Sequence, residues 1–426
     1  MSSSIGIAAL CIGLTVGCMA SVDAAARPQS TWKIGAPIVT YFAGPGGFQP
    51  VNDQTVAQLR AGGWNMGWAE TPADLDVYHR YGIRAMLMIN TPNIDDPAQA
   101  KALDTLIKQV RNHPALYAYY IIDEPGSGAF PGLAKLVDYV RERDPAHFSY
   151  INLLPTYASD AQLNVSDDDA ERARVGYPQD FAGIADDKVA LRYREHLRRF
   201  IDTVNPDLIS YDHYNFMKND DGQQYFLNLA LVRSAALEAK KPFLNIFQAC
   251  DSPEEGWRWP NENEIRWLTY TSLAYGAQGI SHFRYDAGLW QDRKNPVTPL
   301  PQFWAVSQIN REFLAIATLL QPLTSIGAYH CGTVPQGGQA LPKASTFVPS
   351  PLPQELLLGY FGKSAKKPTH VVVVNLNYKK AVTTTLIGPG PMEVFHAPTN
   401  AWHTAPGSKQ INLDLAPGGG VLVRLK

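Results

Sequence analysis

The sequence predicts an α/β protein, a (β/α)₈ TIM barrel followed by a small C-terminal antiparallel β-sandwich. From Pro37 to about Gln321, short apolar runs typical of buried strands alternate with amphipathic segments typical of helices. The runs number eight, which favours a closed barrel over an open doubly wound sheet. After about Leu323 the helical pattern gives way to short strands among Gly, Pro and Ser residues. We therefore expect a barrel over residues 27–323 and a β-sandwich over residues 324–426.

The expected barrel strands are rich in aliphatic and aromatic residues. They are Ile38–Phe42, Trp64–Ala69, Ile83–Ile89, Leu116–Ile122, Phe148–Leu154, Leu208–Tyr211, Phe243–Phe247 and Ile280–Tyr285. The expected helices place apolar residues at helical spacing, and they are Thr55–Ala61, Ala98–Arg111, Pro131–Arg143, Tyr193–Val204, Gln224–Ala239, Glu262–Tyr275 and Pro301–Leu320. Strands this apolar, separated by helices, suit a parallel sheet that is covered on its outer side.

Turn-forming residues mark one end of the expected barrel. Tyr81-Gly82 precedes the third strand, Asn205-Pro206 the sixth, and Gly276 lies just before the eighth. The loops that follow the strands are longer and carry the unusual polar residues. Because the active sites of TIM barrels lie at the C-terminal ends of the strands, we expect the functional residues in those loops.

The C-terminal segment carries its own strand signals. The runs Leu356–Phe361, His370–Asn377, Met392–Phe395 and Gly420–Leu425 are separated by turn residues, without helical spacing between them. A small sandwich beside a barrel usually gives structural support, and we expect that role here.

Composition limits the class of partner. The chain has 426 residues, a formal net charge of -2 and 18% charged residues, with acids and bases intermixed. The sequence has no basic stripe of the kind that would indicate binding to a nucleic acid or to an anionic membrane surface. Aromatic residues reach 11%, which suits either a large core or a surface on which the apolar faces of sugar rings stack.

The first residues predict export. Ser4–Met19 is apolar and uncharged but short for a membrane span, and the small residues of Asp23–Ala26 suit a signal peptidase. We expect a signal peptide at 1–26 and a secreted or periplasmic protein. A lipid anchor at Cys18 is the alternative, although Thr15 stands where Leu is usual.

No motif predicts a metal or a cofactor. Cys250 and Cys331 remain after the expected signal peptide, and the sequence leaves open whether they pair. There is no CxxC motif or His/Cys cluster, and Gly44-Pro45-Gly46-Gly47 lacks the dinucleotide-binding spacing. We expect neither cofactor nor metal, and the oligomeric state stays open.

The most informative stretch is Tyr119–Pro125, at the end of the fourth expected strand. It places Asp123 and Glu124 directly after a buried apolar run. A carboxylate in such a place is costly unless it has partners or a chemical role. A structural salt bridge is one interpretation. We favour the other, in which an apolar surround raises the pKa of Glu124 and makes it a general acid.

Together with Phe148–Asn152, Ile209–Tyr214 and Leu273–Ile280, this stretch resembles the clan A glycoside hydrolases, barrel enzymes that include the family 42 β-galactosidases. The resemblance covers the whole expected barrel. It implies carboxylate acid/base cleavage of an O-glycosidic bond in an oligo- or polysaccharide. Glu124 matches the clan's acid/base, and His213 and Tyr214 resemble residues that line the sugar subsite nearest the bond.

Two positions depart from the clan pattern. The clan has Asn before the acid/base, where this sequence has Asp123. The clan's nucleophilic glutamate ends the seventh strand, where this sequence has Gln248, and an amide cannot act as that nucleophile. We predict Asp212 as the second catalytic carboxylate, because it ends the sixth strand among polar and aromatic residues that could hold it ionised. Glu254 and Glu255, in the loop after the seventh strand, remain the competing candidates.

Sugars need many neutral hydrogen bonds and flat apolar surfaces. The predicted substrate-binding residues are Glu70, Asn90, Asp123, Asn152, His213, Tyr214, Gln248, Trp257 and Tyr285. Trp68 is either a stacking residue or a core residue. Glu264 is expected in the first turn of a helix, where its charge favours the helix dipole.

Two other classes of function are weighed. A non-catalytic carbohydrate-binding barrel would explain the missing nucleophile and predicts sugar binding without turnover. A metal-dependent barrel enzyme would use Asp123, Glu124, Asp212 and His213 as ligands, but the first strand lacks the His-x-His that such barrels commonly carry. The glycoside hydrolase remains the favoured interpretation.

Overall fold

The computed structural model describes residues 27–169, 187–292, 297–404 and 409–426. The expected signal peptide at 1–26, with Cys18, lies outside the described residues. Arg27, where the described chain starts, forms an ion pair with Asp138 and donates a hydrogen bond to the carbonyl of Thr203. Among the described helices, none is long and apolar enough to cross a membrane.

The predicted barrel is confirmed. Its strands form one eight-stranded sheet in the order β1-β8-β7-β6-β5-β4-β3-β2, and every neighbouring pair is parallel. The strands are β1 (Ile38–Phe42), β2 (Met66–Ala69), β3 (Arg84–Met88), β4 (Leu116–Asp123), β5 (Phe148–Leu153), β6 (Ile209–His213), β7 (Phe243–Gln248) and β8 (Gly279–Phe283). Each overlaps a strand that the apolar runs predict.

Asn65 closes the remaining gap between β1 and β2. Its side-chain oxygen accepts a hydrogen bond from the Val39 amide at 2.9 Å, and its side-chain nitrogen donates to the Pro37 carbonyl at 2.8 Å. The Asn65 amide donates to the Val39 carbonyl at 3.1 Å. A side chain thus replaces part of the backbone ladder at this seam.

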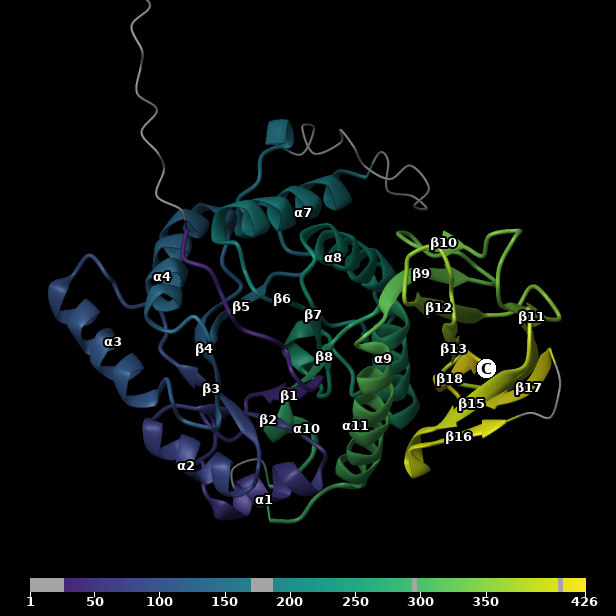
Figure 1. The fold of residues 1–426 in the computed structure, drawn as a ribbon, viewed down its shortest axis with the longest axis horizontal. Coiled ribbons are helices and arrows are strands. Elements are labelled where there is room, and N and C mark those ends of the chain that lie inside the picture. Colours follow the sequence, from purple (N-terminus) through teal and green to yellow (C-terminus); the bar gives the residue numbers. More distant parts are fainter. Residues whose placement is uncertain (1–26, 170–186, 293–296, 405–408) are drawn as a thin grey trace, which may run out of the picture.

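Helices cover the outside of the barrel (Figure 1). The longer ones are α1 (Asp53–Ala61), α2 (Pro72–Arg80), α3 (Pro97–Val110), α4 (Phe130–Arg143), α7 (Lys188–Arg199), α8 (Tyr225–Ala239), α9 (Glu262–Tyr275) and α11 (Pro301–Leu320). A π-helical turn, Phe200–Val204, extends α7, while α5 (Asp160–Leu163) and α10 (Tyr285–Gly288) are single turns. The predicted helix stops at Asn205 and Gly276 both have left-handed backbone conformations.

Helix α2 is absent from the predicted helices. It buries only Leu75 and Tyr78, so its apolar spacing is weak. Its start does carry a signal, because Pro72 occupies the first turn and Thr71 forms a capping box with Asp74.

Aromatic side chains form a layer inside the barrel. The Trp68 ring lies 4.9 Å from that of Tyr120 and 5.8 Å from that of Tyr150, measured between centroids. Trp68 is only 5% exposed, and its indole nitrogen donates to the Tyr41 carbonyl at 2.6 Å. It is therefore a core residue and not a surface for stacking a ligand.

The predicted C-terminal antiparallel β-sandwich is also confirmed. A seven-stranded sheet has the order β10-β9-β12-β13-β18-β15-β16, and a three-stranded sheet has the order β11-β14-β17. Only the short β9–β10 pair among the described strands of these sheets is parallel. The strands are β9 (Thr324–His330), β10 (Gln339–Ala340), β11 (Val348–Ser350), β12 (Leu356–Gly362), β13 (His370–Asn375), β14 (Val382–Ile387), β15 (Met392–His396), β16 (Ala401–Thr404), β17 (Gln410–Leu415) and β18 (Gly420–Leu425).

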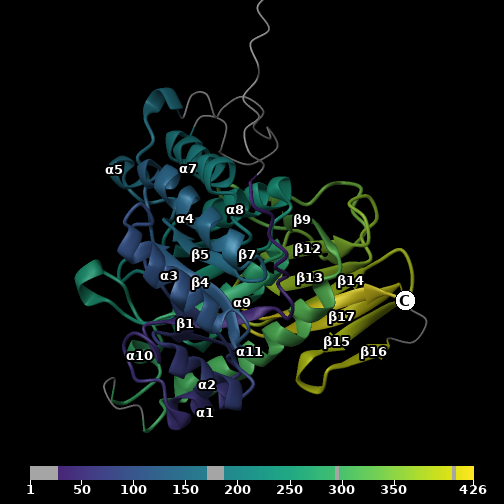
Figure 2. The ribbon, with the colours of Figure 1, turned by 60° about the vertical axis from the view of Figure 1, so that its left-hand side comes forward.

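The larger sheet is buried on both faces. In β12, Leu356 and Leu358 join the core that the sandwich forms for itself, whereas Leu357 and Phe361 join the core of the barrel. This alternation follows from the period of two along a strand. Figures 1 and 2 show α9 and α11 between this sheet and the barrel strands. Gly359 permits the close approach, because a Cβ there would lie 2.3 Å from the Ala274 carbonyl oxygen of α9.

We predict that Gly359→Ala destabilises the protein by about 1–3 kcal/mol, because the added methyl group overpacks the contact between β12 and α9. Gly390→Ala is the matched control, since a Cβ at Gly390 would meet no atom within 4 Å. The free energy of unfolding in urea measures both. Equal stability of the two variants would show that the sheet does not press on α9.

Candidate functional site

A cavity of about 630 Å³ opens at the C-terminal ends of the barrel strands. Its walls come from the end of β4 and the segments that follow β5, β6, β7 and β8. The lining residues are Glu124, Leu154, Pro155, Tyr157, Ala158, Gln162, Tyr214, Cys250, Asp251, Ser252, Pro253, Glu254, Glu255, Trp257, Phe283, Arg284 and Ala287. The size suits a small ligand, and none of these residues belongs to the C-terminal sheets.

Two predicted carboxyl groups interact beside this cavity, and a third is the chain neighbour of one of them. Asp123 ends β4, and Glu124, which lines the cavity, follows it. Asp212 on β6 is only 3% exposed, and its carboxyl is in hydrogen-bonding contact with the side chains of Glu124 and Tyr214. The structure therefore brings the two predicted catalytic carboxyls into direct contact.

Glu124 has a left-handed backbone conformation, with a φ of 47°. For a residue other than glycine this costs on the order of 1 kcal/mol, and such residues gather at functional sites. Its amide donates to the Asn152 carbonyl at 2.9 Å, which holds the turn after β4 against β5. The conformation turns the chain where the clan's acid/base stands.

Burial and like charge raise the pKa of both contacting carboxyls. The pKa of Asp212 is well above its usual value because of burial and then the negative charges of Glu124 and Asp123. The pKa of Glu124 is raised by burial and by the charge of Asp123, while its contact with Asp212 lowers it. Burial and the neighbouring negative charges therefore favour the protonated form of each carboxyl in the pair.

The direction of the Asp212 pKa shift differs from one expectation from the sequence. The neighbours of Asp212 were expected to hold it ionised, but the Tyr214 contact, which does lower the pKa of Asp212, is outweighed by burial. Depth of burial is set by how the loops pack over β6, so the residues on either side of Asp212 do not reveal it.

Aromatic rings form a continuous arc beside the carboxyls. Ring centroids are 6.2 Å apart for Phe48 and Phe42, 5.5 Å for Phe42 and Phe283, 4.9 Å for Phe283 and Tyr214, and 4.5 Å for Tyr214 and Trp257. Phe48 is 60% exposed at the outer end of the arc. The arc offers flat apolar faces next to ionisable groups. The predicted places of Tyr214 and Trp257 in this region agree with the structure.

Tyr157 also lines the cavity, and the sequence interpretation missed it. It lies in the loop after β5, is 46% exposed, and its hydroxyl accepts a hydrogen bond from the Tyr214 amide at 3.2 Å. Its hydroxyl proton is thus available to another acceptor. The available signal was an aromatic residue shortly after a strand end, where TIM barrels place functional residues.

The cavity wall is acidic. Among the described residues that line it, Arg284 is the one Arg or Lys, and it forms a two-bond ion pair with Asp286 at 3.0 and 2.8 Å. Glu254 is exposed, and the Ser252 hydroxyl lowers its pKa, so it stays ionised. Glu254 and Glu255 lie at the cavity wall, as the competing assignment requires.

Gln248 does not fit the predicted sugar-binding role. It is fully buried, and its amide nitrogen donates to the carbonyls of Phe216 at 3.0 Å and Arg258 at 2.7 Å. Its oxygen accepts from the Phe216 amide at 2.8 Å. The side chain therefore joins the segments that follow β6 and β7, and it stands where the clan's nucleophile would be.

His213 and Tyr285 are also not among the described residues that line the cavity. The His213 imidazole bonds the Asn228 side chain of α8 at 2.9 Å, and burial lowers its pKa to about 4, so it is neutral. Tyr285 is fully buried and packs 5.2 Å from the Trp64 ring. Both belong to the packing around the barrel, which corrects their assignment as substrate-binding residues.

The other predicted residues lie in three different places. Asn152 is buried beneath the cavity and donates to Asp123 at 3.0 Å. Glu70 and Asn90 are exposed after β2 and β3 and are not among the described residues that line the cavity. Glu264 caps the start of α9 and pairs with Arg258, which confirms the expected helix-start role.

Within the described ranges, no three His, Cys, Asp or Glu side chains are arranged to hold a metal ion. His213, one of the four ligands of the metal hypothesis, faces Asn228. Cys250 and Cys331 are both buried free thiols, which answers the question of pairing that the sequence left open.

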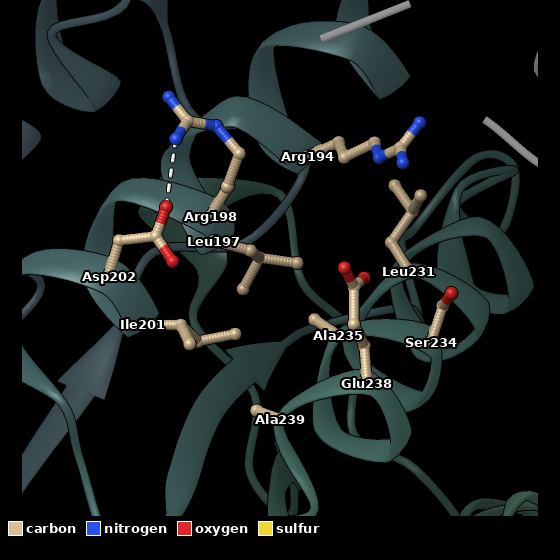
Figure 3. Close-up of a pocket in the computed structure, with 10 residues that line it drawn as sticks. All are labelled: Arg194, Leu197, Arg198, Ile201, Asp202, Leu231, Ser234, Ala235, Glu238 and Ala239. Carbon is tan, nitrogen blue, oxygen red and sulfur yellow. Dashed lines mark hydrogen bonds and ion pairs between the residues drawn. The ribbon is translucent and has the colours of Figure 1, made fainter. Parts of the chain in front are cut away.

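A second cavity, of about 230 Å³, lies between α7 and α8 on the outside of the barrel. Figure 3 shows apolar side chains, among them Leu197, Ile201 and Leu231, with the Arg198–Asp202 ion pair at one edge. None of the predicted site residues lines it. The cavity at the strand ends is therefore the candidate site.

Comparison with known proteins finds likeness in fold. No family model and no curated protein matches the sequence. The structure of a glycoside hydrolase family 5 protein from Bacteroides vulgatus matches with a TM-score of 0.54 at 11% identity, over 91% of this chain and 89% of that chain. Another structure, described as a glycoside hydrolase, matches with a TM-score of 0.54 at 9% identity, over 92% of each chain. The predicted resemblance to barrel glycosidases is confirmed at the level of the fold.

Proposed function

We propose that the protein is a glycoside hydrolase that cleaves an O-glycosidic bond in an oligo- or polysaccharide. The observation that carries the proposal is the contact between Glu124 and Asp212 at the base of the cavity. A carboxyl pair that retains one proton supplies both the acid and the carboxylate that this reaction needs. The shared fold with barrel glycosidases supports the same conclusion.

In this proposal Glu124 is the general acid and Asp212 the nucleophile. A retaining pair has its carboxyls about 5–5.5 Å apart and an inverting pair about 6.5–9.5 Å apart, so carboxyls close enough to interact directly favour a retaining mechanism. The shared proton first moves from Asp212 to Glu124. Glu124 then donates it to the glycosidic oxygen while the Asp212 carboxylate attacks the anomeric carbon. A water that gives its proton to Glu124 finally releases the sugar from Asp212.

Sugar recognition is assigned to the aromatic arc and to neutral donors. The rings of Tyr214, Trp257 and Phe283 are placed for stacking against the C–H faces of a pyranose. The Tyr157 hydroxyl supplies a donor beside the carboxyls. The acidic wall disfavours anionic sugars, because a uronate would meet Asp251, Glu254 and Glu255.

A non-catalytic carbohydrate-binding barrel is the second candidate. The observation that favours it is Gln248, whose amide is engaged by backbone groups at the nucleophile position. This candidate requires sugar binding without any turnover. A screen of the purified protein against aryl glycosides and polysaccharides separates the two functions.

We predict that Glu124→Gln folds normally and loses at least about a hundredfold in kcat on a substrate with a poor leaving group, as expected for loss of a general acid. An aryl glycoside with a good leaving group should lose far less in the bond-breaking step, because its oxygen needs no protonation. Near wild-type turnover of the poor leaving group would exclude Glu124 as the acid.

We predict that Asp212→Asn abolishes turnover and that azide restores it with formation of a glycosyl azide, because azide occupies the place of the missing nucleophile. Glu254→Gln and Glu255→Gln are the matched comparison and should retain turnover. An active Asp212→Asn variant beside a dead Glu254→Gln or Glu255→Gln variant would move the second carboxylate to the loop after β7.

A further inference from the structure

Asp123 adds a third acid to a pair that already shares a proton, and its catalytic consequence rests on the function proposed above. The clan pattern has a neutral asparagine at this place. No Lys, Arg or His is among the charged groups that shift the pKa of Asp123, Glu124 or Asp212 in the described chain. An uncompensated acid beside two others is unfavourable, so its retention needs an explanation.

A chain of buried hydrogen bonds ends on Asp123. The side-chain nitrogen of Asn152 donates to Asp123 Oδ1 at 3.0 Å, and the Ser210 hydroxyl donates to Asn152 Oδ1 at 2.9 Å. The Tyr150 hydroxyl lies 2.8 Å from the Ser210 hydroxyl. Asn152, Ser210 and Tyr150 are all buried, so water does not compete for these bonds.

The donor and acceptor groups of these side chains determine which group donates in each hydrogen bond. Asn152 Oδ1 can only accept a hydrogen bond, so the Ser210 hydroxyl donates its proton to that oxygen. The Ser210 oxygen must therefore accept a hydrogen bond from the Tyr150 hydroxyl. With the Asn152 amide turned over, Asp123 would have to carry a proton, and the Tyr150 proton would have no acceptor among these groups. The observed order therefore presents a donor to Asp123. This hydrogen bond lowers the pKa of Asp123 and so opposes burial, which raises it.

We infer that Asp123 is a positioning residue whose fixed negative charge, held by the Tyr150–Ser210–Asn152 chain, keeps a proton on the Glu124–Asp212 pair. Asp123 is the neighbour of Glu124 in sequence, and its negative charge raises the pKa of both members of the pair. In the reaction, Asp123 would keep the acid loaded at a pH where an isolated glutamate is ionised.

Other groups face the Glu124–Asp212 pair, and each of them either also favours its protonated form or affects it weakly. Tyr157 and Tyr214, from the loops after β5 and β6, stay protonated, because burial and the charge of Asp212 raise the pKa of each. Across the cavity lie Cys250, Asp251, Glu254, Glu255 and Arg284, and Arg284 is neutralised by Asp286. None of these touches Asp123 as Asn152 does.

The test is a pH titration of the Glu124 side chain by NMR in the full chain labelled with ¹³C-glutamate, with the Glu124 signal assigned by its loss in Glu124→Gln. In Asp123→Asn we expect the apparent pKa reported by Glu124 to fall by about one unit or more, because one repelling charge is removed. The introduced amide keeps an oxygen that accepts from Asn152, so the fold is preserved. Asp123→Ser is the second variant if Asp123→Asn does not fold.

Two variants control for the effect. Asp123→Glu keeps the charge and should keep the raised pKa, whereas Asp95→Asn removes an exposed carboxylate from the loop after β3 and should cause no shift. Ser210→Ala breaks the chain and should shift the Glu124 pKa in the same direction as Asp123→Asn, by a smaller amount. An Asp123→Asn titration that coincides with that of Asp95→Asn would overturn the inference.

Measurements of activity distinguish a failure of this inference from a failure of the proposed function. With a substrate, the alkaline limb of kcat/KM should move to lower pH in Asp123→Asn. The NMR titration needs no substrate, so absence of turnover in the wild type contradicts the proposed function and leaves the titration to decide on Asp123.

Discussion

The repulsion among Asp123, Glu124 and Asp212 is the constraint on which the candidate site depends. Three acids lie together, and no basic group of the described chain compensates them. Like charges and burial raise the pKa of all or part of such a cluster, which favours its protonated forms. In the function proposed above, the same repulsion that would weaken a purely structural site serves proton transfer. The cluster lies at the strand ends, beside an arc of aromatic rings.

The rest of the barrel holds this cluster in place. The left-handed turn at Glu124 is tied to β5 through the Asn152 carbonyl, while Asn152, Ser210 and Tyr150 orient the hydrogen bond to Asp123. Gln248 joins the segments after β6 and β7 through three hydrogen bonds to backbone groups. The C-terminal sheets pack on α9 and α11, away from the cavity, and their contribution is to bury the outer faces of these helices.

The sequence predicts more of the fold than of the site. The barrel strands were recognisable because parallel strands covered by helices are apolar throughout, and this property is local. Helix α2 is not predicted from the apolar spacing, because it buries only Leu75 and Tyr78. Glu124 and Asp212 can be proposed as candidates from the sequence because carboxylates at buried strand ends are conspicuous, and the structure brings their side chains together. Tyr157 was missed, and Gln248 and His213 were misassigned, since loop packing and the direction of a strand-end side chain depend on the tertiary fold. The raised pKa of Asp212 depends on burial depth for the same reason.

The measurement that tests this account most directly is a neutron diffraction structure of the perdeuterated, unliganded protein at neutral pH. The account predicts one deuteron between the carboxyls of Asp212 and Glu124, bound to Asp212, and no deuteron on Asp123. It also predicts that Ser210 donates to Asn152 Oδ1 and that Tyr150 donates to Ser210. A fully ionised cluster, or a deuteron on Asp123 with the Asn152 amide turned over, would contradict it.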